Sequence, residues 1–229
     1  MNEGLVRSLN TPWIPWLILL ALSFSLAYIR YTDQKRFGLI IKSHFNGIVF
    51  REAVREETLF SSVTSRLLLL NSVFVGALLI GAIISFYTAS LPSTTQLLYL
   101  IGAIAGYQVV KWILSSIVGW LGEVRSVQGD YKARNIFYVQ TAGIFLLPFV
   151  VGYYFFPSYF QNIPLKAISI WLGIGMITVL YFIKLAQTVM QTTTIKISWY
   201  YIILYLCTLE ILPLVVLFRL LVVEFRVFD

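Results

Sequence analysis

Charged residues are scarce in this sequence. Asp, Glu, Lys and Arg make up 12% of the 229 residues, and 59% are hydrophobic, whereas a soluble domain is about a quarter charged and about 45–50% apolar. This balance excludes an ordinary soluble domain and predicts that most of the chain lies in lipid. Apolar segments run through nearly the whole sequence and leave no room for a second soluble core, so we expect one integral membrane domain over residues 1–229.

Cysteine and histidine are equally rare. Cys207 is the single cysteine, so it can form no intrachain disulfide. His44 is the single histidine, and no cysteine or carboxylate cluster stands near it at ligand spacing, so we expect neither a metal site nor a haem site. The sequence also lacks the G-x-S-x-G, HExxH and Walker-type motifs. We therefore predict no catalytic residues, no cofactor, and a protein that is not an enzyme.

Long hydrophobic runs are the main feature that is present. A helix of roughly twenty apolar residues crosses a bilayer core of about 30 Å. Six runs qualify, and they predict an all-α, polytopic transmembrane bundle with spans at about residues 13–29, 67–87, 96–121, 136–156, 165–185 and 199–223.

The few basic residues gather in alternate connections. The connection between the third and fourth runs holds Arg125, Lys132 and Arg134, and Lys184 and Lys196 flank the fifth connection. The first connection, residues 30–66, holds seven more basic residues, whereas residues 88–95 hold none. Because Lys and Arg mark the cytoplasmic side, this pattern predicts that both chain ends face outward, which in a bacterial inner membrane is the periplasm. The net charge is +7, but the Lys and Arg residues that produce it lie in short segments beside apolar spans and not on one face of a globular domain. The charge therefore does not predict nucleic-acid binding.

Within the first connection, residues 31–65 predict an amphipathic cytoplasmic segment. We expect two short helices at the membrane surface, interrupted near Asn46 and Gly47. One interpretation is a solvated linker whose bases extend into water, and the other is a docking surface for a cytoplasmic partner. The residues that would form the interface are apolar at helical spacing in the first helix and basic in the second: Phe37, Phe45, Arg51 and Arg55.

Two ionisable residues lie deep within predicted spans. Lys111 and Glu210 stand about 16 and 18 Å from the cytoplasmic ends of their helices, at a rise of about 1.5 Å per residue. An unpaired charge at that depth costs about 2.5–3.5 kcal/mol or more, so we predict a buried pair between them, with Tyr107 and Gln108 as supporting polar groups. The pair could fix helix packing, relay protons or ions, or hold an anionic lipid or peptide group. Each charge could instead face a partner subunit.

Proline and glycine positions suggest local irregularity and close helix packing. Pro148 and Pro213 remove a backbone donor and should kink their helices. Gly102 and Gly106 form a small-xxx-small pattern that would let another helix approach closely.

These features together resemble a known group of sequences. The first helix, the basic amphipathic stretch, Lys111 and the run from Tyr205 to Pro213 are similar to an uncharacterised bacterial inner-membrane family known only as a domain of unknown function. The last five spans also resemble the Yip-type membrane proteins, with a polar loop from Gly129 to Asn135 and a mid-helix proline. That second resemblance implies a trafficking adaptor without catalysis, although the extra first helix departs from its pattern.

The sequence favours three functions in order. The first is a non-catalytic subunit or assembly factor of a larger inner-membrane complex, in envelope biogenesis or protein export, whose partners are the lipid bilayer and other membrane subunits. The second is a small transporter or ion-coupled membrane protein that uses Lys111 and Glu210. The third is an enzyme that acts on lipid.

Overall fold

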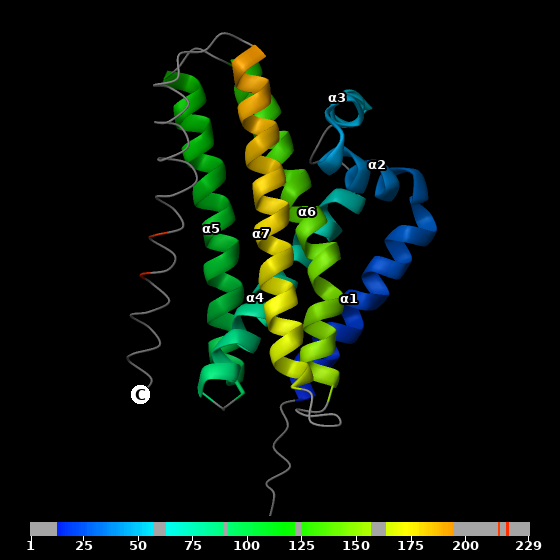
Figure 1. The fold of residues 1–229 in the computed structure, drawn as a ribbon, viewed down its shortest axis with the longest axis vertical. Coiled ribbons are helices and arrows are strands. Elements are labelled where there is room, and N and C mark those ends of the chain that lie inside the picture. Colours follow the sequence, from blue (N-terminus) through cyan, green and yellow to red (C-terminus); the bar gives the residue numbers. More distant parts are fainter. Residues whose placement is uncertain are drawn as a thin grey trace, which may run out of the picture.

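A computed structural model of the protein describes residues 13–56, 63–88, 91–121, 125–156 and 164–194, together with residues 215 and 219. All the elements in these ranges are helices, as Figure 1 shows. They are α1 (Trp13–Thr32), α2 (Gln34–Phe45), α3 (Gly47–Glu56), α4 (Val63–Thr88), α5 (Thr94–Leu121), α6 (Arg125–Phe155) and α7 (Leu165–Thr194). The predicted all-helical membrane bundle is therefore confirmed.

Five of these helices are long and apolar enough to cross a membrane. They are α1, α4 and the stretches Thr94–Ile117, Gly129–Phe155 and Leu165–Thr188 of α5, α6 and α7. Each of them overlaps one of the first five predicted spans. The sixth predicted span, residues 199–223, lies outside the described residues apart from two isolated positions.

Two helix boundaries differ from the sequence prediction. Helix α6 begins at Arg125 and not at Ile136, and α7 continues to Thr194 and not to Leu185. The stretch from Gly129 to Asn135 is thus helical, and its prediction as a polar loop was wrong. The physical reason is packing, because Tyr131 and Arg134 are buried among other helices. This burial stabilises a helix that the polar sequence alone does not predict.

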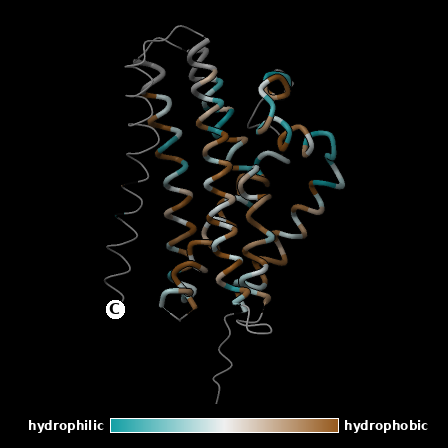
Figure 2. The backbone as a smooth tube through the Cα atoms, viewed as in Figure 1, coloured by the Kyte–Doolittle hydropathy of each residue, from teal (hydrophilic) through white to brown (hydrophobic). Residues whose placement is uncertain are grey.

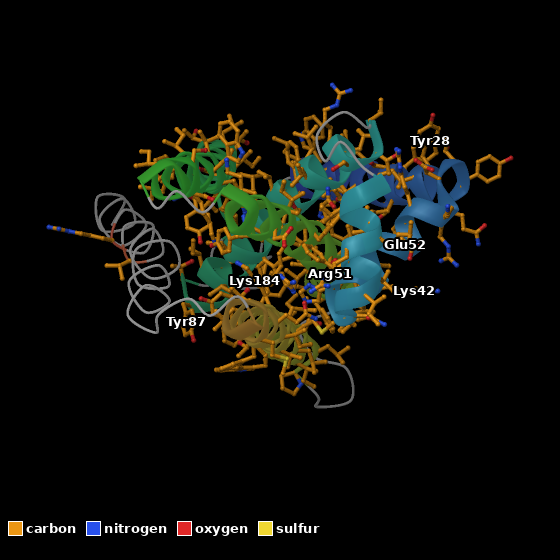
Figure 3. All side chains as sticks on the ribbon, turned by 90° about the horizontal axis from the view of Figure 1, so that it is seen from above. Tyr28, Lys42, Arg51, Glu52, Tyr87 and Lys184 are labelled. Atoms are coloured by element: carbon orange, nitrogen blue, oxygen red, sulfur yellow. The ribbon has the colours of Figure 1, made fainter. Side chains whose placement is uncertain are left out.

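Helices α2 and α3, which we call the platform, form the predicted broken pair between the first two spans. Asn46 ends α2 with an extended backbone, and its Oδ1 accepts a hydrogen bond of 2.9 Å from the backbone N–H of Ile48 in the first turn of α3. One asparagine therefore stops one helix and caps the next. The platform lies at the end of the bundle where hydrophilic residues gather (Figure 2), and Figure 3 looks down onto this end.

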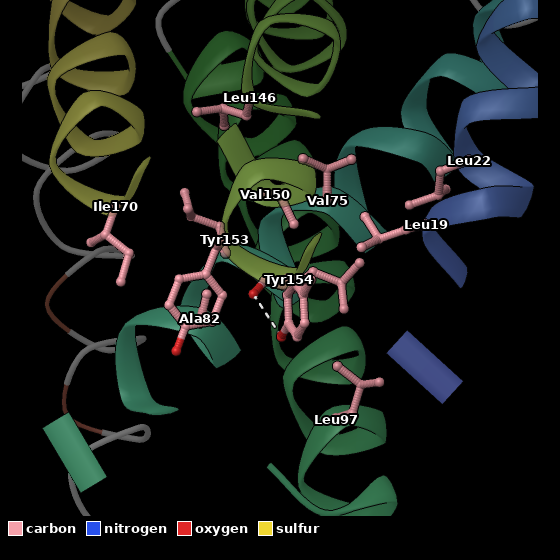
Figure 4. Packing of buried hydrophobic residues seen from close by; sticks show 12 residues of the cluster. Leu19, Leu22, Val75, Ala82, Leu97, Leu146, Val150, Tyr153, Tyr154 and Ile170 are labelled. Atoms are coloured by element: carbon pink, nitrogen blue, oxygen red, sulfur yellow. Dashed lines mark hydrogen bonds between the residues drawn. The ribbon is translucent and has the colours of Figure 1, made fainter. Parts of the chain in front are cut away.

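Helix α6 occupies the centre of the bundle. It packs mainly against α4 and α7 and also contacts α1, α2, α3 and α5. Away from the platform, Val150 and Leu146 of α6 lie in a core that includes Leu19 of α1 and Ile170 of α7 (Figure 4). A second core, beneath the platform, brings together residues of α1, α2, α3, α4 and α6: Ile29, Ile40, Phe50, Ala53, Leu68, Ala133 and Phe137.

Glycine brings α4 and α6 closest together at one crossing. A Cβ atom built on Gly143 would lie 2.7 Å from the Cα of Ser72, so only glycine fits. Gly102 and Gly106 differ, because both are exposed and no atom of the surrounding residues comes within 4 Å of a Cβ built on either. Packing of another helix against these two glycines stays a prediction.

Candidate functional site

Two cations and the single histidine lie together beneath the platform. His44 comes from α2, Arg134 from α6 and Lys184 from α7, and their exposed fractions are 3%, 4% and 1%. We call these three residues the cation cluster. Burial of this kind is costly for charged groups unless hydrogen bonds and opposite charge or polarisable groups surround them, so the surroundings of each member decide what the cluster can do.

Lys184 lies in an aromatic cage. Its Nζ is 5.7, 5.0 and 5.9 Å from the ring centroids of Tyr131, Tyr138 and Tyr181, and it donates a 3.0 Å hydrogen bond to Oδ1 of Asn135. A cation near an aromatic ring is stabilised by about 2 kcal/mol or more when both are desolvated. The ring faces and the amide oxygen thus replace part of the water that the ammonium group has lost.

Arg134 connects the membrane helices to the platform. Its guanidinium carbon lies 4.4 Å from the ring centroid of Phe50 in α3, and it donates a hydrogen bond to Oε1 of Gln187 in α7. Gln187 in turn donates through Nε2 to the backbone oxygen of His44, at 2.7 Å. Arg134, Gln187 and the end of α2 therefore form one continuous chain of hydrogen bonds. Asp130, about one turn before Arg134, attracts the guanidinium electrostatically.

His44 is neutral at neutral pH. Burial lowers the pKa of its imidazole from 6.5 to about 4, a hydrogen bond to the Leu180 backbone opposes that shift, and repulsion from Arg134 and Lys184 adds to it. The ring lies 5.9 Å from the ring of Tyr138. Its Nε2 atom has no hydrogen-bond partner among the described residues, so the neutral ring presents an unused acceptor there.

The cation cluster lies near the platform end of two helix stretches that are suited to a membrane. Arg134 lies one to two turns after Gly129, where the stretch Gly129–Phe155 begins, and Lys184 lies about one turn before Thr188, where the stretch Leu165–Thr188 ends. Figure 3 shows Lys184 within the bundle and Arg51 on the platform above this end.

The predicted buried pair is described only in part. Lys111 is 4% exposed in α5, and its Nζ is 5.9 Å from the ring centroid of Tyr107, whereas Gln108 is half-buried. Glu210 lies outside the described residues, so its pairing with Lys111 stays a prediction.

The other predicted site residues have diverse environments. Pro213 lies outside the described residues, and α6 continues as one helix through Pro148, which is exposed. Phe37 packs against the second core, whereas Phe45 and Arg51 are exposed. Arg55 lies in α3.

Sequence reasoning missed the cation cluster because it treated Arg134 and Lys184 as cytoplasmic markers. A signal was present. Tyr131, Arg134 and Tyr138 recur at helical spacing, as do Tyr181 and Lys184, so each helix has one face that carries both an aromatic ring and a cation, and such groups attract each other when they meet. Within the described ranges, no three His, Cys, Asp or Glu residues are arranged to hold a metal ion.

Comparison with known families accounts for nearly the whole chain. The family described as "Domain of unknown function (DUF4271)" matches residues 16–221. The chain belongs to the DUF4271 family. The expected resemblance to an uncharacterised membrane family is thereby confirmed for this DUF4271 protein, whereas the similarity to Yip-type proteins stays a prediction. A search of curated proteins and of solved structures gave no match.

Proposed function

We propose that this DUF4271 protein is a non-catalytic subunit or assembly factor of a larger complex in the bacterial inner membrane, one that serves envelope biogenesis or protein export. The platform is its contact surface for partner subunits. Five apolar helices suited to a bilayer support the membrane part of this proposal. The structure of the platform supports the rest.

The platform is anchored on one side and open on the other. Its inner face is fixed by Ile40, Phe50 and Ala53, which are buried in the second core, and by the hydrogen bond from Gln187 to the His44 backbone. A solvated linker would need no such anchoring. The outer face exposes Ile48, at 80%.

Charge and apolar area alternate on this outer face. Phe45 is 49% exposed, and Lys42, Arg51 and Glu52 are exposed around it. Exposed apolar side chains rimmed by charge are typical of protein interaction sites. The excess of basic residues at this end favours a cytoplasmic location, so a partner with an acidic cytoplasmic segment would fit.

Co-purification tests this proposal. The tagged protein is extracted from its own cells in mild detergent, and bound proteins are identified by mass spectrometry. We expect defined membrane partners, and we expect Ile48→Ser combined with Arg51→Ser to reduce their recovery about tenfold. Leu91→Ser is the matched control, because Leu91 is 43% exposed and precedes α5 at the opposite end of the bundle. Recovery of the free protein alone, or equal recovery by both variants, would contradict the proposal.

One observation favours a second function. Lys111 is almost completely buried in the middle of α5, and ionisable groups at such depth often serve ion or proton transfer. A small ion-coupled transporter is therefore the alternative.

A further inference from the structure

The cation cluster contains buried polar atoms that the described chain leaves unused. Nε of Arg134 and Nε2 of His44 have no hydrogen-bond partner among the described residues, although both side chains are more than nine-tenths buried. Buried polar groups without partners are rare in proteins and call for an explanation such as a bound ion, ligand or water. The two atoms come from different helices, α6 and α2. Nε of Arg134 is an open donor that suits an anion, whereas Nε2 of neutral His44 is an open acceptor that suits a protonated ligand oxygen or a water.

The hydrogen-bond acceptor at the Arg134 guanidinium is neutral. Gln187 supplies an amide oxygen to Arg134. An amide oxygen solvates a cation but adds no opposite charge. Asp130 attracts Arg134 from about one turn away, but the hydrogen-bond position on the guanidinium is held by Gln187. An anion at that position would gain a charge-assisted hydrogen bond that the amide cannot match.

We propose that the cation cluster is a binding site for the phosphate group of an anionic ligand at the membrane boundary. Phosphate fits because a guanidinium group offers paired donors to its oxygens and an ammonium group adds a compact charge. The level of the site fits as well, since Arg134 and Lys184 lie near the ends of the two membrane-suited stretches Gly129–Phe155 and Leu165–Thr188. Basic pockets between membrane helices at this level are typical sites for phospholipid headgroups.

The ligand reaches the cluster by displacing Gln187. This side chain is only half-buried, and a phosphate oxygen would take over the hydrogen bond that Arg134 now donates to its amide. Arg51 is exposed on the platform at the same end of the bundle (Figure 3) and would attract anions toward the cluster.

The test uses the purified full chain in two arms that distinguish the sources of phosphate. In the first arm, the thermal midpoint is measured in nanodiscs of phosphatidylcholine with and without phosphatidylglycerol, and native mass spectrometry reports retained lipid. In the second arm, inorganic phosphate is added to protein in neutral detergent, with chloride at equal ionic strength as the control. A rise in the first arm alone identifies a lipid headgroup, and a rise in both identifies phosphate as sufficient. No rise in either arm overturns the proposal.

Substitutions locate the effect. Arg134→Gln should weaken binding about tenfold or more, whereas Lys132→Gln, on the same helix, should leave it unchanged. Lys132 is a suitable control because its Nζ bonds to Ser116 of α5, away from the cluster. Equal losses in both variants would indicate a diffuse surface effect and would overturn the proposal.

A second pair of variants avoids the risk that Arg134→Gln fails to fold. Gln187→Glu places a carboxylate where the phosphate would bind, so the ligand-induced shift should disappear. Gln187→Ala removes the competing amide and keeps both cations, so the shift should persist. A shift that survives in Gln187→Glu, or one that is lost in Gln187→Ala, would overturn the proposal.

Discussion

Gly143 and Ser72 mark the point where two membrane helices touch almost backbone to backbone. A Cβ on Gly143 would lie 2.7 Å from both the Cα and the Cβ of Ser72, a separation that real side chains do not adopt. Because α6 packs against most of the other helices, this crossing fixes how near the central helix sits to α4.

Gly143→Ala should therefore destabilise the protein. Overpacking costs about 1–3 kcal/mol, and the better helix propensity of alanine offsets at most about 1 kcal/mol of that. The free energy of unfolding, measured in detergent with a denaturant, checks the prediction. Gly175→Ala is the control, since Gly175 is exposed and no atom lies within 4 Å of its added Cβ. An equal or smaller loss in Gly143→Ala than in the control would contradict the close crossing.

Stability should fall as the pH falls below about 6.5. His44 has a folded-state pKa of about 4 and an ordinary value of 6.5, so the unfolded chain binds more protons between these values and stability declines toward pH 4. The loss should reach about 3 kcal/mol. Above pH 6.5 this contribution is fully present. Thermal midpoints across this pH range provide the measurement.

His44→Asn is the matching control for that pH series. Asparagine does not titrate, and its side-chain amide can still donate toward the Leu180 backbone to which His44 is hydrogen-bonded. The variant should show a flatter profile between pH 4 and 6.5. An unchanged slope in the variant would assign the effect to another group.

Gln140→Leu should weaken the contact between α4 and α6. Gln140 is fully buried, and its Nε2 donates to the backbone oxygen and to Oγ of Ser65, at 3.1 and 2.7 Å. Hydrogen bonds between membrane helices contribute about 0.6 kcal/mol on average and at most about 1.7, so we expect a loss of about 1 kcal/mol in unfolding measurements. Thr178→Val is the control, because Thr178 is exposed and bonds only within α7. A larger loss in the control would refute the assignment.

The predicted pair of Lys111 and Glu210 can be tested by double substitution. Lys111→Met and Glu210→Leu should each lower the yield of folded protein, because each leaves a buried charge behind, and the two together should restore it. If the pair relays ions, the double variant should fold and lose transport. A double variant that also fails to accumulate would contradict both roles of the pair.

The sequence was sufficient for the architecture of the bundle. Length and hydropathy predicted the first five spans, and the helical spacing around Asn46 predicted the broken platform, because both depend on local properties of the chain. The polar residues before Ile136, which form the first turns of helix α6, could not be predicted in this way. This part of α6 is stabilised by burial of Tyr131 and Arg134 against residues far away in the sequence.

The cation cluster escaped prediction for a related reason. Lys184 and Arg134 follow the positive-inside pattern, and that pattern gives a sufficient account of a basic residue at a helix end without any site. Only the meeting of α2, α6 and α7 shows that these cations turn inward toward His44. Spacing alone indicates which residues share a helix face but not which helix lies opposite.

The central position of α6 has a consequence for biosynthesis. The ribosome completes α1 to α5 before the residues of α6 have emerged, so the earlier helices enter the bilayer while the helix that most of them pack against is still missing. Until then, buried polar groups such as Ser65 and Asn71 of α4 face lipid, other early helices or the insertion machinery. Assembly of this protein therefore depends on one helix that is synthesised late. A chain truncated before Arg125 would contain α1 to α5 but would lack the central helix against which most of them pack.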